Sequence, residues 1–235
     1  MKPTLLLVED DPISARFLTA ALEALPATVE VAGSLADAIA AAGPHDLWLL
    51  DANLPDGSGI ELLARLRERH PRVPALAHTA DDSPSLKSRL LASGFAAVLV
   101  KPLAAVVLQR AVREALGLEP DSPPEPGAGC GSPDETPLWD DAVALAALNG
   151  NATHLQTLRD LFLQELERQH SIVLTALASR DFEQARHHLH QMRASSGFVG
   201  AMRLQRVATL LERSPEEADV AAEFDAVLRQ TRSGR

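Results

Sequence analysis

The stretch LLLVEDD, residues 5–11, joins a short apolar run to three consecutive carboxylates. An apolar run of this length, bounded by polar residues, predicts a buried β-strand. Three acids placed directly after such a strand repel one another unless a cation lies among them. The stretch therefore predicts a cation site at the end of the first strand.

Three later apolar runs also deliver a polar group at the point where the run ends. LWLLD ends at Asp51, PALAHT ends at Thr79, and FAAVLVK ends at Lys101. Ligands of open α/β sheets bind beyond the carboxyl ends of the strands. We therefore expect these groups to meet the acids of the first run at one edge of a sheet.

In their order along the chain these motifs resemble the receiver domain of two-component response regulators. The resemblance implies an α/β fold with a flavodoxin-like, doubly wound, five-stranded parallel sheet. It also implies that Asp51 is the phosphoacceptor, that the Thr79 hydroxyl donates to a phosphoryl oxygen, and that Lys101 pairs with the phosphoryl oxygens. Phosphoryl transfer builds charge on these oxygens, so positive groups are the expected catalysts.

The same resemblance implies Mg²⁺ as the cofactor. Asp10, Asp51 and the backbone carbonyl of Asn53 would bind the ion directly, and Glu9 would hold one of its waters. Mg²⁺ prefers such a shell of oxygens that keeps several waters. Asp11, the third acid of the run, is interpreted as a loop charge that opens the next helix.

Two details of the receiver motif concern its last strand. Pro102 predicts a cis bond after Lys101, because only proline makes that isomer accessible at low cost. The family usually has an aromatic residue three positions before the lysine, where this chain has Val98. The usual coupling between phosphorylation and a distant surface is therefore in question, and spacing does not show whether Phe95 substitutes.

Over residues 1–117, short apolar runs alternate with helical patterns. This rhythm predicts a parallel sheet covered by helices on both faces. The expected strands are residues 4–8, 28–32, 46–50, 73–77 and 96–100, and the expected helices are residues 13–25, 35–42, 58–70, 84–93 and 103–117.

Composition divides the chain into domains. It has 235 residues, of which 46% are hydrophobic, and a net charge of −10, so more than one core is expected. Residues 118–137 contain six prolines and five acidic residues but no basic one, which predicts an extended linker. We therefore expect a receiver domain over residues 1–117, this linker, and a second domain over residues 138–235. Cys130 is the single cysteine and excludes an intrachain disulfide.

Several classes of protein do not fit this sequence. No opening segment resembles a signal peptide or a membrane span, so a cytoplasmic protein without a membrane partner is expected. No basic recognition helix indicates binding to nucleic acid. The ATP-binding part of a histidine kinase is also lacking, so phosphoryl groups must come from a partner or a small donor, and no conventional turnover enzyme is expected.

Residues 138–235 show no strand pattern. Long amphipathic helical patterns break at Arg180–Asp181 and near Gly197–Gly200, which predicts a four-helix bundle. At about 100° per residue, one face of the helix after Asp181 is apolar or small and is the expected core face. Its members are Phe182, Ala185, Leu189, Met192, Ser196 and Val199. His190 lies far from the centre of this face, so we expect it to be presented to solvent.

The segment HHLHQMRASSGFVG resembles the phosphoacceptor helix of a histidine-phosphotransfer (HPt) domain. The resemblance implies that His190 carries the phosphoryl group and that Arg193, Ala194 and Gly200 support it. Arg replaces the usual Lys of the motif, and Ala replaces the usual first Gly. An exposed neutral imidazole is a competent phosphoryl acceptor.

The two resemblances together predict a phosphorelay protein and its partners. Sensor or hybrid histidine kinases and other receiver domains are expected to exchange phosphoryl groups with it. The small residues Ala194, Ser195 and Gly197 are expected to leave room beside the histidine for a partner's surface.

Some alternatives stay open. A metal site formed by His187, His188 and His190 is disfavoured, because no cysteine or well-placed carboxylate completes a tetrahedral set. The competing hypothesis is a phosphorylation-gated binding module in which His190 never carries phosphate. The sequence does not decide the identity of the kinase and the downstream regulator, the direction of transfer, exchange between Asp51 and His190 within one chain, or the oligomeric state.

Overall fold

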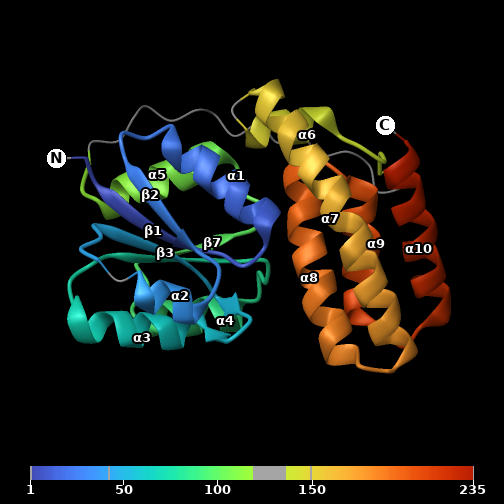
Figure 1. Cartoon of the computed structure of the whole chain (residues 1–235), viewed down its shortest axis with the longest axis horizontal. Coiled ribbons are helices and arrows are strands. Elements are labelled where there is room, and N and C mark those ends of the chain that lie inside the picture. The colour runs from blue at the N-terminus through green and yellow to red at the C-terminus, as the bar shows by residue number, and fades with distance from the viewer. Residues whose placement is uncertain (1, 42, 119–135, 149, 235) are drawn as a thin grey trace. The chain divides into compact units, whose positions relative to one another are not determined.

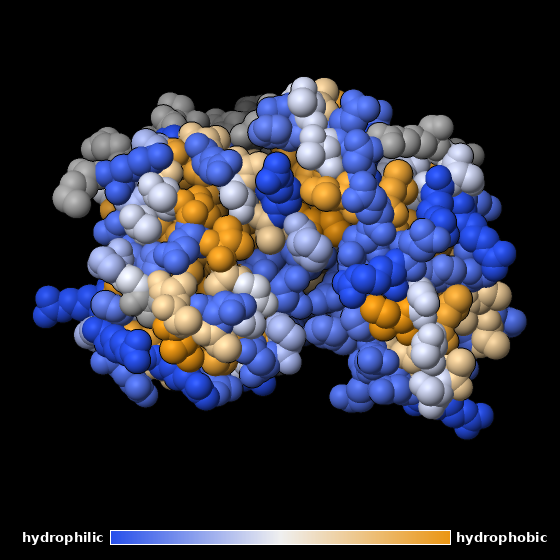
Figure 2. Space-filling view, in the orientation of Figure 1, coloured by the Kyte–Doolittle hydropathy of each residue, from blue (hydrophilic) through white to orange (hydrophobic). Residues whose placement is uncertain are grey.

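The computed structural model describes residues 2–41, 43–118, 136–148 and 150–234. Most of the predicted linker, including Cys130, lies outside the described residues. The chain forms two compact units, one N-terminal and one C-terminal to residues 119–135. Figure 2 shows that hydrophilic residues cover much of the visible face of each unit, with apolar residues in smaller groups.

The first unit is built on a five-stranded parallel sheet (Figure 1). Its strands are β1 (Thr4–Val8), β2 (Thr28–Ala32), β3 (Leu47–Asp51), β6 (Ala75–Thr79) and β7 (Ala97–Val100). Their order across the sheet is β2-β1-β3-β6-β7, which is the doubly wound, flavodoxin-like order. The predicted fold class is therefore confirmed.

Helices cover both faces of this sheet. Figure 1 shows α1 (Pro12–Glu23) and α5 (Ala105–Ala115) on one face, and α2 (Leu35–Ala40), α3 (Gly59–Arg69) and α4 (Pro84–Ala92) on the other. All residues of β3 and β6 are buried. Strands covered on both faces read as continuous apolar runs, which is why the sequence pattern located them.

Two local features differ from the expectation. The strand expected at residues 73–77 lies two residues later, so Thr79 is its last residue. A two-stranded hairpin of β4 (Asn53–Leu54) and β5 (Gly57–Ser58), not expected from the sequence, follows β3. The hairpin returns the chain to β3 at Gly59, where an added Cβ would lie 2.3 Å from the carbonyl oxygen of Asp51. Only glycine fits this approach.

The second unit contains only helices among its described residues. These are α6 (Asp141–Ala147), α7 (Ala152–Ala178), α8 (Phe182–Val199), α9 (Met202–Arg213) and α10 (Ala218–Ser233). Each of the four long helices packs against the next, and α10 returns to α7, so the predicted four-helix bundle is confirmed (Figure 1). The short α6 is an addition. None of the helices that the structure describes combines the length and the apolarity needed to cross a bilayer.

The two helix ends of α8 follow from its sequence. Asp181 is the N-cap, and its side chain accepts a hydrogen bond from the backbone N–H of Gln184 at 3.1 Å. Gly200 ends the helix in the left-handed region with φ 77°. A Cβ there would lie 2.3 Å from the carbonyl oxygen of Asp140, so the glycine lets the segment before α6 pack against the α8–α9 turn.

Asp56, in the turn between β4 and β5, caps the N-terminus of α2, which lies about twenty residues earlier in the chain. Its carboxylate accepts hydrogen bonds from the backbone N–H groups of Leu35 at 2.8 Å and Ala36 at 2.9 Å. These hydrogen bonds favour the ionised form and lower the pKa of Asp56 below its ordinary value. The turn and the N-terminus of α2 therefore hold each other in place.

We predict that Asp56→Ala lowers the melting temperature of the first unit at neutral pH, and that this loss shrinks below about pH 4. A carboxylate whose folded-state pKa is depressed stabilises the fold above its ordinary pKa, and that stability is lost as the pH falls through the folded-state pKa. Fluorescence of Trp48, buried in β3, follows this unit once Trp139 of the second unit is replaced by Phe. An equal loss at neutral and acidic pH would contradict the cap.

Candidate functional site

The carboxyl edge of the sheet brings three charged side chains together. Asp51 ends β3, Glu9 follows β1, and Lys101 follows β7. The ammonium group of Lys101 donates to Glu9 Oε2 at 2.5 Å and to Asp51 Oδ2 at 2.6 Å. All three side chains are buried. The ends of β1, β3 and β7 thus bring Glu9, Asp51 and Lys101 together at one edge of the sheet, as the sequence predicted.

Burial and mutual attraction set the protonation of these groups. Burial raises the pKa of Glu9 well above its ordinary value, although Lys101 opposes that rise. Burial acts in the same sense on Asp51, but there the attraction of Lys101 prevails and lowers the pKa. The two carboxylates in turn raise the pKa of Lys101 against the effect of burial. Asp51 is thus held ionised, which is the form that attacks a phosphorus atom.

Asn53 and Thr79 are the two other residues of the receiver motif, and Thr79 ends β6, the strand next to β3. The backbone N–H of Asn53 donates to Asp51 Oδ1 at 2.9 Å. The Thr79 hydroxyl is buried and accepts from the backbone N–H of Asp81 at 3.1 Å, which leaves its own proton to donate. The proposed roles of the Asn53 carbonyl and of Thr79 toward a ligand stay predictions.

The two remaining acids of the first run differ in position. Asp11 is the N-cap of α1, and its side chain accepts a hydrogen bond from the backbone N–H of Ser14 at 2.8 Å. It therefore opens this helix, as the sequence predicted. Asp10 does not belong to the close group of possible ligands formed by Glu9, Asp51 and His78, so its role as a direct metal ligand stays a prediction. The bond between Lys101 and Pro102 is cis, as predicted.

A group of three buried residues offers ligand atoms for a cation. One atom each from Glu9, Asp51 and His78 lies within 4.8 Å of the others. The two carboxylates fit Mg²⁺, because that ion takes oxygen ligands and is attracted by paired acids. His78 was not predicted as a site residue, although a histidine inside the apolar run of β6 is a signal that was present in the sequence.

His78 lies entirely inside the protein. Its Nε2 is 3.2 Å from the carbonyl oxygen of Val8, and its Nδ1 is 3.3 Å from Glu9 Oε2 and 3.8 Å from Asp51 Oδ2. Burial, reinforced by the positive charge of Lys101, lowers the pKa of His78 to about 3. The imidazole is therefore neutral at physiological pH.

The aromatic position of the receiver motif holds no exposed ring. Val98 is partly buried and packs against the core of the first unit. Phe95 is 4% exposed and belongs to that core. Phe95 therefore does not present a ring at the surface in place of the usual aromatic residue.

In the bundle, His190 is joined to a residue of the next helix. Its Nδ1 is 2.9 Å from Glu212 Oε1, and Arg193 Nη1 is 3.0 Å from Glu212 Oε2. The side chain of His190 is 23% exposed, so one part of the ring reaches the surface. His187 is more exposed, and His188 Nδ1 is 2.9 Å from Gln169 Oε1.

The Glu212 contact determines which ring nitrogen of His190 is the nucleophile. An ionised carboxylate only accepts hydrogen bonds, so Nδ1 must carry the proton that it donates to Glu212. In a neutral imidazole the lone pair then lies on Nε2. The longer 3.3 Å contact from Arg193 Nη2 to Nδ1 does not reverse this, because Arg193 has Glu212 as its acceptor.

Glu212 was not identified in the sequence, although α8 and α9 are joined by a very short turn. Residues equally distant from the turn of such a helical hairpin lie at the same height, because both helices rise 1.5 Å per residue. His190 is ten residues before Gly200, and Glu212 is eleven residues after Ala201. Their contact follows from this count.

The expectation for the small residues after Arg193 was wrong. Ala194 and Ser195 are each 3% exposed, and Gly197 is buried as well. They lie inside the bundle, where α6, α7 and α9 pack against α8, and so leave no room at the surface. On the expected core face of α8, every member is buried except Phe182, which is partly exposed at the start of the helix.

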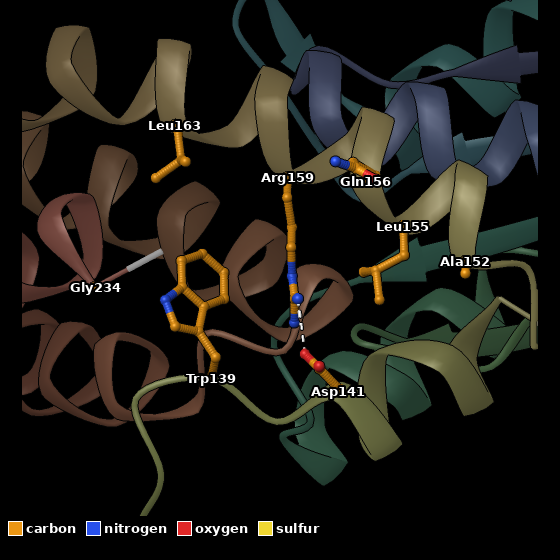
Figure 3. Close-up of a pocket in the computed structure, with 8 residues that line it drawn as sticks. All are labelled: Trp139, Asp141, Ala152, Leu155, Gln156, Arg159, Leu163 and Gly234. Carbon is orange, nitrogen blue, oxygen red and sulfur yellow. Dashed lines mark ion pairs between the residues drawn. The ribbon is translucent and has the colours of Figure 1, made fainter.

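A cavity of about 360 Å³ lies elsewhere in the second unit, beside Trp139 and α7 (Figure 3). Arg159 is one of the residues that line it. Its guanidinium carbon lies 4.8 Å from the centre of the Trp139 ring, and its Nη1 pairs with Asp141 Oδ1 at 2.7 Å. Its Nε also donates to the carbonyl oxygen of Val199 at 3.0 Å. These polar groups already join α6, α7 and α8, and no predicted site residue lines the cavity.

Two family models match this chain, one in each unit. Residues 5–113 match the family model of the response regulator receiver domain, and residues 157–234 match that of the Hpt domain. The chain therefore contains a receiver domain followed by an Hpt domain. The two domains together place it in the class of two-component phosphorelay proteins.

Several curated relatives combine similar segments. The signal transduction histidine-protein kinase BarA of Shigella flexneri is 27% identical over 250 residues, which cover 97% of this chain and 27% of that protein. The sensor protein TorS of Escherichia coli is 26% identical over 230 residues, covering 93% of this chain and 23% of that protein. The chain thus spans about a quarter of the length of these relatives. A solved chemotaxis response regulator of Vibrio cholerae is 26% identical, with a TM-score of 0.47, and covers 49% of this chain and 100% of its own.

We predict that Glu212→Ala slows phosphorylation of His190 by about tenfold to a hundredfold, the loss expected for a hydrogen bond to a charged group. Without the acceptor, Nδ1–H no longer fixes the tautomer that exposes the Nε2 lone pair. The rate is measured with phosphoramidate as donor, in a chain whose Asp51 is replaced by Asn. Glu216→Ala, which removes an exposed carboxylate from the following turn, is the control. Equal rates in both variants would contradict the role of Glu212.

Proposed function

We propose that this chain is a phosphoryl carrier with two sites, Asp51 in the receiver domain and His190 in the Hpt domain. The observation that carries the proposal is that each nucleophile is held by a charged partner in its reactive form. Lys101 keeps Asp51 ionised, and Glu212 leaves the lone pair of His190 on Nε2. Asp51 lies within the residues that match the receiver family model, and His190 lies within those that match the Hpt family model.

At the receiver site, an Asp51 carboxylate oxygen attacks the phosphorus of a phosphohistidine donor. A P–O bond forms, the P–N bond breaks, and its electron pair returns to the donor imidazole. The Lys101 ammonium neutralises charge that builds on the phosphoryl oxygens, and the Thr79 hydroxyl donates a hydrogen bond to one of them. Glu9, Asp10, Asp51 and the Asn53 carbonyl would hold Mg²⁺, which supplies further positive charge when bound.

At the Hpt site, Nε2 of His190 attacks the phosphorus of an aspartyl phosphate on a receiver domain. The P–N bond forms while the P–O bond breaks, and its electron pair returns to the aspartate carboxylate. Glu212 stabilises the positive charge that the ring gains, because it accepts the Nδ1–H hydrogen bond throughout. Arg193, one helical turn away, would attract the phosphoryl oxygens through its guanidinium. The step is reversible, so its direction depends on the partner.

The partners follow from this chemistry. We propose a sensor or hybrid histidine kinase as the source of phosphoryl groups and another receiver domain as the acceptor or second donor. The full-length relatives BarA and TorS are named as a histidine-protein kinase and a sensor protein, which supports such partners. We also retain the boundaries 1–117, 118–137 and 138–235 for the two domains and their linker. A cytoplasmic location is part of the proposal, because kinases of this class draw their phosphoryl groups from ATP.

A second function is favoured by one observation. Val98 gives the receiver no aromatic side chain to relay its phosphorylation state along the usual route, so its output must take another form. In the alternative, phosphorylation of Asp51 gates binding through the bundle and His190 stays unmodified. Mapping of phosphate on the full chain distinguishes the two, because only the relay places phosphate on His190.

We predict that Asp51→Asn abolishes labelling of the receiver domain by acetyl phosphate, because the amide lacks the nucleophilic charge. Removal of divalent cations with EDTA should have the same effect, since the buried carboxylates then face the phosphoryl group with less positive charge. The site is mapped by mass spectrometry of the full chain. Asp82→Asn, which changes an exposed acid beyond β6, is the matched control. Unchanged labelling in Asp51→Asn would remove the assignment.

We also predict that His190→Gln blocks transfer through the Hpt domain, whereas His187→Gln and His188→Gln retain it. Only His190 has its Nδ1 tied to a carboxylate and one side of its ring at the surface. The measurement is transfer from a phosphorylated receiver domain to each variant. A similar loss in all three variants would indicate misfolding or a shared metal site instead.

A further inference from the structure

The imidazole of His78 is the one part of the receiver site that the proposed chemistry does not use. Its side chain is fully buried at the end of β6, the strand next to β3. Its Nδ1 has no hydrogen-bond partner among the residues that the structure describes. A buried polar atom without a partner is costly and calls for an explanation.

The hydrogen bond on the other side of the ring fixes its tautomer. A backbone carbonyl only accepts hydrogen bonds, so the 3.2 Å contact with Val8 requires the proton to be on Nε2. The Nδ1 atom of the neutral ring then carries a lone pair. A ring nitrogen oriented in this way, with its other N–H on a carbonyl, has the arrangement of a metal-ligating histidine.

The lone pair points toward other acceptors. Nδ1 lies 3.3 Å from Glu9 Oε2 and 3.8 Å from Asp51 Oδ2. Three acceptor atoms this close repel one another unless a cation lies among them. Lys101 donates hydrogen bonds to the two oxygens but not to the nitrogen. Within the part of the chain that the structure describes, the lone pair of Nδ1 is therefore still without a positive group or a donor that contacts it.

We propose that Nδ1 of His78 is a protein ligand of the divalent cation in the receiver site. This inference rests on the proposed function, because it concerns the cation site of that same domain. With Glu9 and Asp51 it makes a mixed nitrogen and oxygen ligand set. Imidazole favours transition-metal ions of intermediate softness, whereas Mg²⁺ favours oxygen alone. The site therefore takes a divalent transition-metal ion in preference to Mg²⁺.

Cobalt is the probe, because its absorption and its paramagnetic NMR shifts report directly on nitrogen ligands. The full chain is titrated with Co²⁺ and with Mg²⁺, and the same is done for His78→Leu. We expect the variant to bind Co²⁺ about tenfold to a hundredfold more weakly, the range seen when metal-site support is removed, with Mg²⁺ affinity nearly unchanged. In the wild-type chain, the Nε2–H proton of His78 should give a hyperfine-shifted exchangeable resonance.

Two controls locate the effect. His45→Leu removes another buried histidine that lies before β3, at the opposite end of that strand from Asp51, and should leave Co²⁺ binding unchanged. His188→Gln tests whether the histidines of the bundle account for the shifted resonance. Trp48 fluorescence, measured in chains with Trp139→Phe, tests whether His78→Leu is folded, and the resonance of the wild-type chain tests ligation without any variant at position 78.

The outcomes separate this inference from the function on which it rests. Binding of Mg²⁺ and Co²⁺ that depends on Asp51, with no nitrogen-coupled resonance, would overturn the role of His78 and leave the phosphoacceptor site standing. Failure of both ions to bind would overturn the cation site itself. Co²⁺ binding that survives His78→Leu unchanged would also overturn the inference.

Discussion

The receiver site depends on one buried interaction, the ammonium group of Lys101 held between the carboxylates of Glu9 and Asp51. Moving a charge out of water costs several kcal/mol for each ion even after the protein relaxes. One ammonium neutralises only one of the two carboxylates. Burial raises the pKa of Glu9, whereas the attraction of Lys101 outweighs burial at Asp51 and lowers its pKa. This asymmetry keeps the nucleophile ionised and leaves the site attractive to a further cation.

The two phosphoryl sites use the same physical device with opposite charges. In the receiver domain the Lys101 ammonium, just after β7, holds the Asp51 carboxylate in its nucleophilic form. In the bundle the Glu212 carboxylate, on α9, does the same for the His190 imidazole. The partners lie 50 residues apart in the first case and 22 in the second. The reactive form of each nucleophile thus depends on a residue that only tertiary packing brings close. The short motifs around Asp51 and His190 do not include that residue.

Most of the fold was predictable because its elements are long and regular in pattern. Apolar runs located the strands, and the N-cap at Asp181 located the start of α8. The strand expected at residues 73–77 was displaced because Pro74 has no backbone N–H to donate, so the regular ladder begins after it. The hairpin β4–β5 has two residues in each strand and therefore no period to detect. The small residues after Arg193 were misplaced because they lie inside the bundle, where α6, α7 and α9 pack against α8.

The site was predictable only as far as its residues lie at the ends of strands or in a known motif. The contact of Glu212 with His190 could have been found by counting residues on either side of the α8–α9 turn, because antiparallel helices joined by a short connection have a fixed register. His78 was not, since its ring reaches the carbonyl of Val8 on β1, and β3 lies between their two strands. A strand pattern states which residues are buried, but it does not state which polar atoms meet inside. In this chain the motifs identify the nucleophiles, whereas contacts between separate elements determine which protons and cations accompany them.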